Sequence, residues 1–184
     1  MADGTAKYAP PENSAVDPVD FETAGAEAKP ELRLWLRLLT CTTMIEAEIR
    51  QRLRAEFGVT LPRFDLLAQL DKAPDGMTMS ALSQHLMVTN GNVTGLVERL
   101  VAEDLVTRTP DPQDRRSQIV ALTRIGRRSF EAMAAAHEGW VSDLFDGLDP
   151  AETAQLMRLL TVTKRSVGAT IGRTATKKAR NVPR

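Results

Sequence analysis

The chain has 184 residues, of which 42% are apolar and 26% charged, and its 24 basic and 24 acidic side chains give a formal net charge of zero. This is an ordinary globular composition, and no stretch approaches the ~18 consecutive apolar residues of a membrane-spanning helix. The single cysteine, Cys41, excludes an intrachain disulfide and a multi-cysteine zinc site. Because no apolar secretory signal follows Met1, we expect a cytoplasmic protein.

The net charge of zero conceals three segments of different charge. Residues 1–31 carry seven acids and two bases, residues 164–184 carry seven bases and no acid, and the remaining residues have a net charge of −2. We therefore predict a flexible acidic arm, a folded domain and a flexible basic tail, at residues 1–30, 31–167 and 168–184. A net charge of zero does not exclude a nucleic-acid partner, because a polyanion binds where positive charge is concentrated locally, whatever the total charge of the chain.

Apolar residues spaced three and four apart predict a first helix of about 26 residues that ends near Gly58. These positions are Leu32, Trp35, Leu36, Leu39, Ile45, Ile49, Leu53 and Phe57. At 1.5 Å per residue the helix would be ~39 Å long, which is more than a small domain covers. We therefore expect a second copy of the chain to cover the rest of the apolar stripe.

Three shorter helices are predicted next. Pro62 favours a helix start, and the turn-forming residues 73–76 end that helix. Thr78 and Thr89 are each positioned to cap a further short helix. The apolar residues expected to point inward are Phe64, Leu67 and Leu70, then Leu82 and Leu86, then Val93, Leu96, Val97, Leu100 and Val101. Two short helices joined by a tight turn predict a helix-turn-helix.

The hydrophobic period then changes from helical to alternating. Residues 105–109 and 118–122 are rich in Val, Ile, Thr and Leu and flank the polar segment 110–117, which predicts a β-hairpin with a basic tip. Thr123 is positioned to cap a long helix whose stripe is Phe130, Met133, His137, Trp140, Val141, Leu144 and Leu148. A capping box at residues 149–152 begins a last helix through Leu156, Leu159, Leu160 and Thr163. The fold predicted is mostly α-helical.

The segment 89–95 has the composition of a helix that reads the DNA major groove. Its short polar side chains can hydrogen-bond base edges or phosphates, and its two glycines permit a close approach. The candidate DNA-binding residues here are Thr89, Asn90, Asn92 and Thr94, with Arg99 one to two turns later and placed to reach a phosphate. Considered without the hairpin that follows, the same residues fit an ordinary capped helix start.

The predicted hairpin tip supplies a second candidate contact. Arg115 and Arg116 project from a proline-containing loop, and an arginine on such a tip can enter the narrow minor groove of DNA. Asp114 can hold a neighbouring guanidinium in a bidentate pair. Residues 99–128 contain seven arginines and four acids, so the candidate reading elements are locally positive.

These motifs resemble a known family. Asp111-Pro112-Gln113-Asp114-Arg115-Arg116 and Val120-Ala121-Leu122-Thr123-Arg124-Ile125-Gly126 resemble the wing and next helix start of the MarR (multiple antibiotic resistance regulator) family, and residues 93–100 with 104–106 are similar to its recognition helix. The resemblance spans residues 32–165. It implies a winged helix-turn-helix homodimer, joined by its first and last two helices, that binds a near-palindromic operator, usually as a repressor released by a small molecule. By the same resemblance, the groove-reading and wing residues are Asn90, Asn92, Thr94, Asp114, Arg115 and Arg116.

Members of this family differ in the effector that they sense. One branch senses peroxide through a cysteine whose position corresponds to Leu36 here, so Cys41 does not fit that branch. Other branches bind aromatic acids, phenols or aryl-CoA thioesters between the dimer helices and the winged domain. The candidate effector residues are Trp35, Thr40, Met44, His137 and Trp140, with Arg33, Arg37 or Arg50 as partner of an anion. Core packing is the more usual role of such aromatic and methionine side chains, and an interface position is the more usual role of a histidine on such a stripe.

The sequence contains no recognisable catalytic arrangement. It has no His/Cys/Asp cluster at metal-ligand spacing, no glycine-rich phosphate loop and no nucleophile elbow, so we predict neither an enzyme nor a cofactor. The alternative function is a winged-helix module that binds a protein, for which an acidic or apolar surface would be expected. The basic tail either adds phosphate contacts or is a solvated end.

Overall fold

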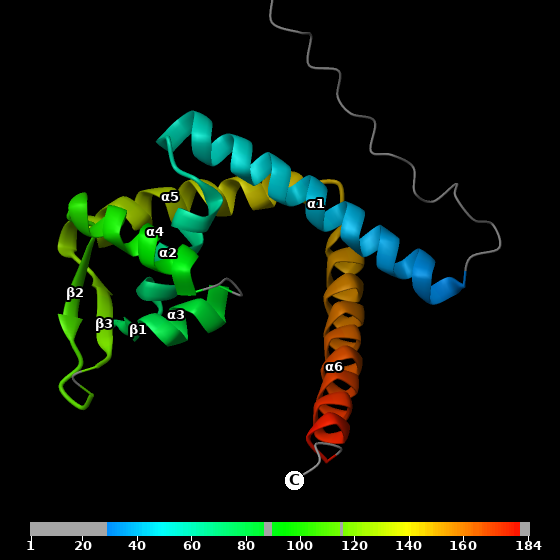
Figure 1. Ribbon diagram of the computed structural model, residues 1–184. Coiled ribbons are helices and arrows are strands. Elements are labelled where there is room, and N and C mark those ends of the chain that lie inside the picture. Colours follow the sequence, from blue (N-terminus) through cyan, green and yellow to red (C-terminus); the bar gives the residue numbers. More distant parts are fainter. Residues whose placement is uncertain (1–28, 87–89, 115, 181–184) are drawn as a thin grey trace, which may run out of the picture. The chain divides into compact units, whose positions relative to one another are not determined.

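The computed structural model describes residues 29–86, 90–114 and 116–180, apart from the side chains of residues 90 and 174–180. This part of the chain contains six helices and a three-stranded sheet, so it is mostly α-helical as predicted (Figure 1). It divides into two compact units, the first ending at Met133 and the second beginning at Ala134. None of its helices is both long enough and apolar enough to span a membrane.

Helix α1 (Pro30–Phe57) confirms the predicted long first helix. Gly58 ends it in the left-handed conformation, with φ of 65°, and donates its N–H to the carbonyl of Arg54. Two side chains of its carboxyl-terminal half, Ile49 and Leu53, are buried. Most large apolar residues nearer its start are exposed, namely Leu32, Leu34, Trp35, Leu39 and Met44, while Leu36 and Leu38 are half-buried. The described residues therefore cover only part of the apolar stripe.

Helix α2 (Leu61–Asp71) has the predicted proline, Pro62, in its first turn and lies at the centre of the first unit. Its buried residues are Phe64, Leu66, Leu67 and Leu70. The turn that follows contains Gly76 with φ of 84°, and a Cβ added there would lie 2.6 Å from the carbonyl oxygen of Val120. Only glycine fits this turn, because both its backbone conformation and its close packing exclude a side chain.

A short strand, β1 (Met77–Thr78), and helix α3 (Met79–Leu86) come next. The Thr78 hydroxyl accepts the N–H of Ala81 at 3.2 Å, which confirms the predicted cap. The sequence did not predict β1, because two residues are too few for a visible alternation. The strand exists because its two residues pair with Val120 and Ile119 of the hairpin.

Helix α4 (Asn90–Ala102) completes the helix-turn-helix, and Val93, Val97 and Leu100 are fully buried. Val101 was predicted to point inward, which is wrong, because it is 40% exposed. Residue 101 lies about 100° further round the helix than residue 100, so it falls at the edge of the buried stripe formed by residues 93, 97 and 100.

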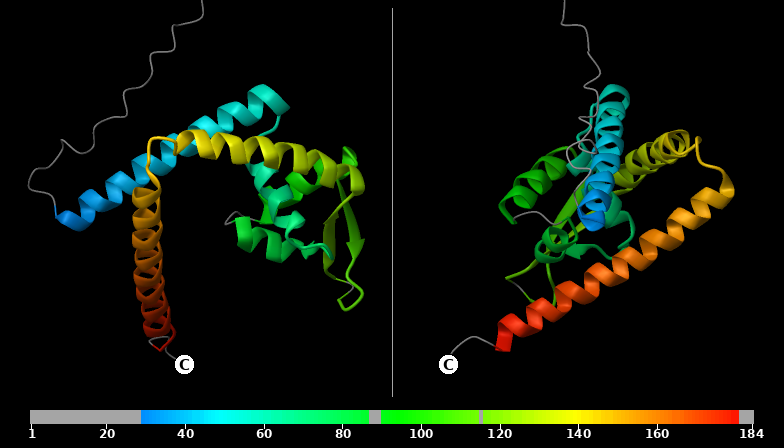
Figure 2. Two further views of the ribbon diagram at one scale, coloured as in Figure 1. Left: turned by 180° about the vertical axis from the view of Figure 1, so that it is seen from behind. Right: turned by 90° about the vertical axis from the view of Figure 1, so that its right-hand side faces the viewer.

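Strands β2 (Val106–Pro110) and β3 (Gln118–Leu122) form the predicted hairpin, with Val106 opposite Leu122 and Pro110 opposite Gln118. β1 joins the other edge of β3, so the sheet order is β1-β3-β2. Seen from front and back, the hairpin extends away from α4 (Figures 1 and 2).

Helix α5 (Arg124–Leu144) starts as predicted, since the Thr123 hydroxyl accepts the N–H of Gly126 at 2.8 Å. Within the first unit, the ring of Phe130 lies 5.6 Å from that of Phe64, measured between centroids. The prediction that Leu148 continues the stripe of this helix is wrong. Because the turn-forming pair Asp146-Gly147 follows the helix, Leu148 lies beyond its end and is exposed.

Helix α6 (Pro150–Arg180) opens on the predicted capping box. The Asp149 carboxylate accepts the N–H of Glu152 at 2.8 Å, and the Glu152 carboxylate accepts the N–H of Asp149 at 2.9 Å.

Helix α6 extends past residue 167, where the sequence predicted a flexible tail to begin. Two isolated glycines cost only about 1 kcal/mol each in a helix, and no proline interrupts the chain before Pro183. Val167 and Ile171 extend the three-and-four spacing of Leu160 and Thr163, and both are exposed.

Candidate nucleic-acid interface

The outer face of α4 is uncovered, which is the condition for a helix that enters a groove. A Cβ added at Gly91 or at Gly95 would meet no atom within 4 Å. These two glycines lie roughly opposite the buried stripe of the helix, so DNA can approach the backbone closely. Asn92 and Arg99 are exposed and Thr94 is half-buried. Thr89 and the side chain of Asn90, two of the predicted contacts, lie outside the described residues.

The hairpin tip is held by hydrogen bonds within the loop. The N–H of Asp111 donates to the carbonyl of Ser117 at 3.1 Å, and the N–H of Ser117 donates to the carbonyl of Asp114 at 2.8 Å. The carboxylates of Asp111 and Asp114 accept the N–H groups of Gln113 and Arg116, at 2.8 Å and 3.0 Å. A loop fixed in this way loses less conformational entropy when it binds.

The Asp114 carboxylate accepts the backbone N–H of Arg116, so it forms an Asx turn within the tip. Its predicted pairing with a neighbouring guanidinium stays a prediction. The Arg116 side chain is exposed, and Arg115 lies outside the described residues.

The base of the hairpin is closed against the end of α4. Asp104 has φ of 57°, and the Thr123 hydroxyl donates to its carbonyl at 2.7 Å. A Cβ added at Gly126 would lie 1.9 Å from the carbonyl oxygen of Leu105. The chain at Gly126 therefore contacts the hairpin base directly, so the glycine of the motif is required by packing. The sequence motif contains this glycine, but it does not indicate that Leu105 packs against it.

Exposed arginines surround these two elements. In the described part of the first unit, Arg99, Arg108, Arg116, Arg124 and Arg128 are exposed and no ion pair is seen for any of them. Arg127 differs from these residues, because it contacts Asp71 at 2.7 Å. Unpaired guanidinium groups beside an open helix face favour a polyanionic partner.

The predicted effector residues are divided between the two units. Arg33, Trp35, Arg37, Thr40 and Met44 lie on the amino-terminal half of α1, where Trp35 and Met44 are largely exposed. His137 and Trp140 belong to the second unit, where their rings lie 6.5 Å apart, edge to face, and Trp140 is buried. Their assembly into one pocket therefore stays a prediction.

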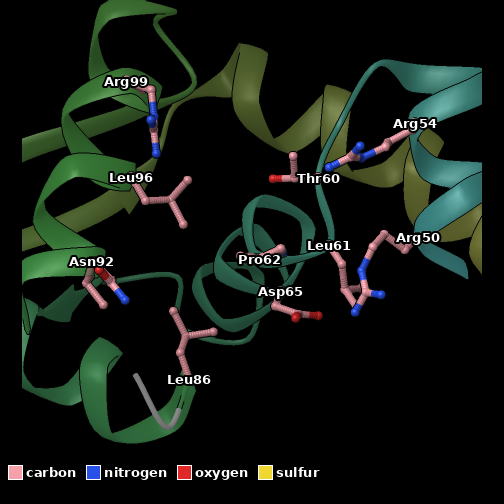
Figure 3. Close-up of a pocket in the computed structure, with 11 residues that line it drawn as sticks. Arg50, Arg54, Thr60, Leu61, Pro62, Asp65, Leu86, Asn92, Leu96 and Arg99 are labelled. Atoms are coloured by element: carbon pink, nitrogen blue, oxygen red, sulfur yellow. The ribbon is translucent and has the colours of Figure 1, made fainter. Parts of the chain in front are cut away.

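One of the predicted effector residues, Arg50, lines a cavity within the first unit. The cavity has a volume of about 530 Å³ and is lined by residues of α1, α2, α3 and α4, among them Arg50, Arg54, Asp65, Leu96 and Arg99. Asn92, Leu96 and Arg99 form one wall, Arg50 and Arg54 the other, and residues 60–65 lie between them (Figure 3). Three guanidinium groups against one carboxylate make this cavity positive.

The sequence reasoning missed Arg54. It lies four residues after Arg50 on the same helix face, so the helical spacing would have placed the two side by side. Arg50 lies 3.7 Å from Glu46, whereas the described residues show no carboxylate paired with Arg54. Arg54 is exposed and directed toward Thr60 (Figure 3).

Comparison with known proteins places this architecture in a family. A model of the MarR family matches residues 57–117. The transcriptional activatory protein BadR of Rhodopseudomonas palustris is 34% identical over 159 residues, which cover 82% of this chain and 90% of BadR. The chain belongs to the MarR family. The HTH-type transcriptional repressor IacR of Pseudomonas putida is 28% identical over 112 residues, covering 61% of this chain and 66% of IacR.

Solved structures agree with this MarR assignment. Wild-type MarR of Escherichia coli, in its apo form, is 26% identical with a TM-score of 0.64, covering 74% of this chain and 98% of MarR. BpsR of Bordetella bronchiseptica, whose DNA binding is regulated by 6-hydroxynicotinic acid, is 28% identical with a TM-score of 0.60, covering 69% of this chain and 89% of BpsR. The chain is therefore a MarR-family transcriptional regulator with a winged helix-turn-helix fold.

Proposed function

We propose that this MarR-family regulator binds a pseudo-palindromic operator as a homodimer, represses transcription there, and is released by a small anionic aromatic effector. The observation that carries the DNA-binding part is the uncovered glycine face of α4 in the same unit as a hairpin whose tip is fixed by its own hydrogen bonds. A helix for the major groove and a hairpin for the adjacent groove are the two parts that winged-helix readout needs.

The proposed contacts follow from position on these elements. Asn90, Asn92 and Thr94 read the major groove from α4, whose start Thr89 caps, while Arg99 reaches a phosphate. Arg115 enters the minor groove from the tip, and Arg116 and Asp114 hold the tip in shape. This surface is polar and basic, which favours DNA over the alternative of a protein partner, for which an acidic or apolar surface would be expected.

The homodimer is supported by exposed apolar residues at both ends of the chain. On α1 these are Leu32, Leu34, Trp35, Leu39 and Met44, and on α6 they are Leu156, Met157, Leu159, Leu160, Val162, Val167 and Ile171. Helix faces of this length are not stable in water unless another surface covers them. A second copy of the chain offers the same faces, and a two-fold operator requires two reading units.

The effector class is supported by the positive cavity and by one relative. Arg50, Arg54 and Arg99 offer guanidinium groups to a carboxylate, and Leu61, Pro62 and Leu96 offer apolar surface to a ring. An aromatic acid or the thioester of an aryl-CoA carries both features. BpsR responds to a hydroxylated aromatic acid. The other predicted effector residues, among them Trp35 and Trp140, are the second candidates for contact with the ring.

The DNA-binding part is tested by anisotropy titration of a fluorescent duplex from the region upstream of the protein's own gene. We expect an affinity that falls steeply with salt, because neutralised phosphates release counterions. Arg115→Ala should weaken operator binding by about 1–3 kcal/mol, the scale of one groove contact. Lys72→Ala, a loss of one exposed positive charge in the turn after α2, is the matched control. An unchanged affinity for Arg115→Ala would remove the hairpin from the interface.

The effector part is tested by calorimetry with benzoate, hydroxybenzoates and their CoA thioesters. We expect binding that is weakened in Arg54→Gln and that lowers the affinity for the operator duplex. Heat changes absent for the whole series would overturn the effector class. In vitro transcription decides the sign of regulation, on which BadR and IacR differ by name: relief of repression on adding the bound effector supports the proposal, and stimulation by the free protein contradicts it.

A further inference from the structure

Helix α2 carries an ion pair at each end, and both pairs reach the DNA-reading elements. Arg63, in its first turn, pairs with Glu103 at the end of α4. Asp71, its last residue, pairs with Arg127 in the first turn of α5. We propose that these two α2 ion pairs position α4 and the hairpin for the operator, so that their acids raise operator affinity although they carry the charge that DNA repels. This inference rests on the proposed DNA-binding function.

The pair at the start of α2 is bidentate. Nη1 of Arg63 donates to Oε1 of Glu103 at 2.8 Å, and Nη2 donates to Oε2. The Arg63 side chain is only 22% exposed, so the guanidinium is held between protein surfaces and does not project into solvent. Two parallel hydrogen bonds between planar groups fix an orientation as well as a distance. The end of α4 is therefore held in one direction relative to α2.

The pair at the other end of α2 fixes the far side of the hairpin. Nη1 of Arg127 donates to Oδ1 of Asp71 at 2.7 Å. Residues 104–126, which lie between Glu103 and Arg127 in the chain, contain the whole hairpin. Its base is already closed by the Thr123 hydroxyl on the carbonyl of Asp104. The two α2 ion pairs thus hold both ends of this closed segment against one helix.

Helix α2 can serve as the fixed reference because it is the most buried helix of the first unit. Leu66, Leu67 and Leu70 have no exposed surface. The apolar contacts of α4, through Val93, Val97 and Leu100, hold that helix in place but do not direct it, since hydrophobic burial is not directional. The hydrogen-bonded ion pairs at the two ends of α2 fix the orientation that burial alone leaves free. This orientation matters because contacts in a DNA groove depend on placing side chains to within a fraction of an ångström.

The sign of the mutational effect distinguishes positioning from simple electrostatics. Glu103→Gln and Asp71→Asn each remove a negative charge from a surface close to the DNA-reading elements. Electrostatics alone therefore predicts tighter binding to any duplex. If the two α2 ion pairs position the reading elements, the variants should bind the operator more weakly and other duplexes as before. Positioning also predicts an unchanged slope of log affinity against log salt, because no phosphate contact is lost.

The experiment is anisotropy titration of the full chain on its upstream operator duplex and on a scrambled duplex, over a series of salt concentrations. We expect Glu103→Gln and Asp71→Asn each to lower operator affinity about three- to tenfold, with unchanged slope and unchanged affinity for the scrambled duplex. Arg63→Lys, which keeps the charge but loses the fork, should behave like Glu103→Gln. Asp75→Asn is the matched control, since Asp75 is an exposed acid without an ion pair among the described residues of this unit, and it should leave operator affinity unchanged or raised.

Thermal unfolding of the same variants shows whether the reduced affinity arises from a loss of folded protein. Operator affinity lowered in variants that remain folded at the assay temperature supports the positioning role. If the wild-type chain binds the operator and Glu103→Gln binds it as well or better, the positioning role is overturned while the proposed function stands. If the wild-type chain binds neither duplex in a salt-dependent way, both are overturned.

Discussion

The winged unit, residues 61–133, and the amino-terminal half of α1 both contain several leucines but bury them to very different extents. In the winged unit Leu66, Leu67, Leu70, Leu82 and Leu100 have no exposed surface, whereas on α1 Leu32 and Leu34 are half exposed. The winged unit buries its leucines in a core formed by one chain. The amino-terminal half of α1 has a continuous apolar face that the described residues leave exposed. This contrast indicates which part folds by itself and which part requires another surface.

The same contrast separates two kinds of glycine. Gly76 and Gly126 are packed against backbone atoms, so their lack of a side chain is required for folding. Gly91 and Gly95 face open space, so folding does not require them. Glycines that the fold does not need, placed on the outer face of a helix, are explained by the approach of a partner. The following predictions use these differences, in order of decreasing effect.

The largest effect is expected for Gly126→Ala. The added methyl group would lie 1.9 Å from the carbonyl oxygen of Leu105, which is backbone and cannot move aside. We expect a loss of about 3 kcal/mol or more in the free energy of unfolding, measured by denaturant titration. Gly139→Ala, in the same helix with no atom within 4 Å, is the control and should stabilise the protein by about 0.5–1 kcal/mol. Equal effects of the two changes would contradict the close packing at the hairpin base.

A second pair of variants compares the two halves of α1. Leu53→Ala removes a fully buried side chain and should lower the free energy of unfolding by about 2–5 kcal/mol at every protein concentration. Leu32→Ala removes one that is 50% exposed and should act through association alone. Its effect on the unfolding midpoint should therefore depend on protein concentration, and sedimentation should show weaker dimers. A concentration-independent loss in Leu32→Ala would contradict the assignment of this face to a partner.

The open face of α4 gives a smaller effect that separates folding from binding. Gly95→Leu should stabilise the free protein by about 0.5–1 kcal/mol, because leucine is the better helix former and its Cβ would meet no atom within 4 Å. The same change should weaken operator binding by about 1–3 kcal/mol, because the side chain occupies the space of the groove. Chemical denaturation and anisotropy titration of one sample measure both. Unweakened binding would place the DNA elsewhere.

The smallest effect is expected at the start of α6. Asp149→Ala removes the acceptor for the N–H of Glu152 and should cost about 1 kcal/mol in the free energy of unfolding. Asp149→Asn retains an oxygen acceptor and is the control. Operator affinity should be unchanged in both, since this cap lies in the second unit.

Most of the fold was predictable because local signals agreed with tertiary packing. The caps at Thr78, Thr123 and Asp149 and the hairpin strands all follow from short stretches of sequence. Strand β1 was not predictable, because its two residues are a strand only through their pairing with β3. The end of α6 was misjudged because glycines and basic residues were read as a tail, although each is tolerated singly in a helix.

The candidate site was predictable for its elements and less so for its internal contacts. The polar start of α4 and the arginines of the tip follow from composition and spacing. The pairing of Arg63 with Glu103 joins residues 40 positions apart, and the sequence around neither residue predicts it. Arg54 became a candidate only when α1, α2 and α4 were seen to enclose one cavity. Long-range contacts of this kind depend on the packed fold.

Two copies of the chain should present two winged units to one operator, and hydroxyl-radical footprinting of the upstream duplex tests this arrangement. We expect two protected segments related by a two-fold axis and separated by about one helical turn, 10–10.5 base pairs, or a multiple of it. We also expect Arg115→Ala to remove the outer, minor-groove protection on both sides. A single unsymmetrical protection, or none at an ionic strength where the protein binds DNA, would contradict it.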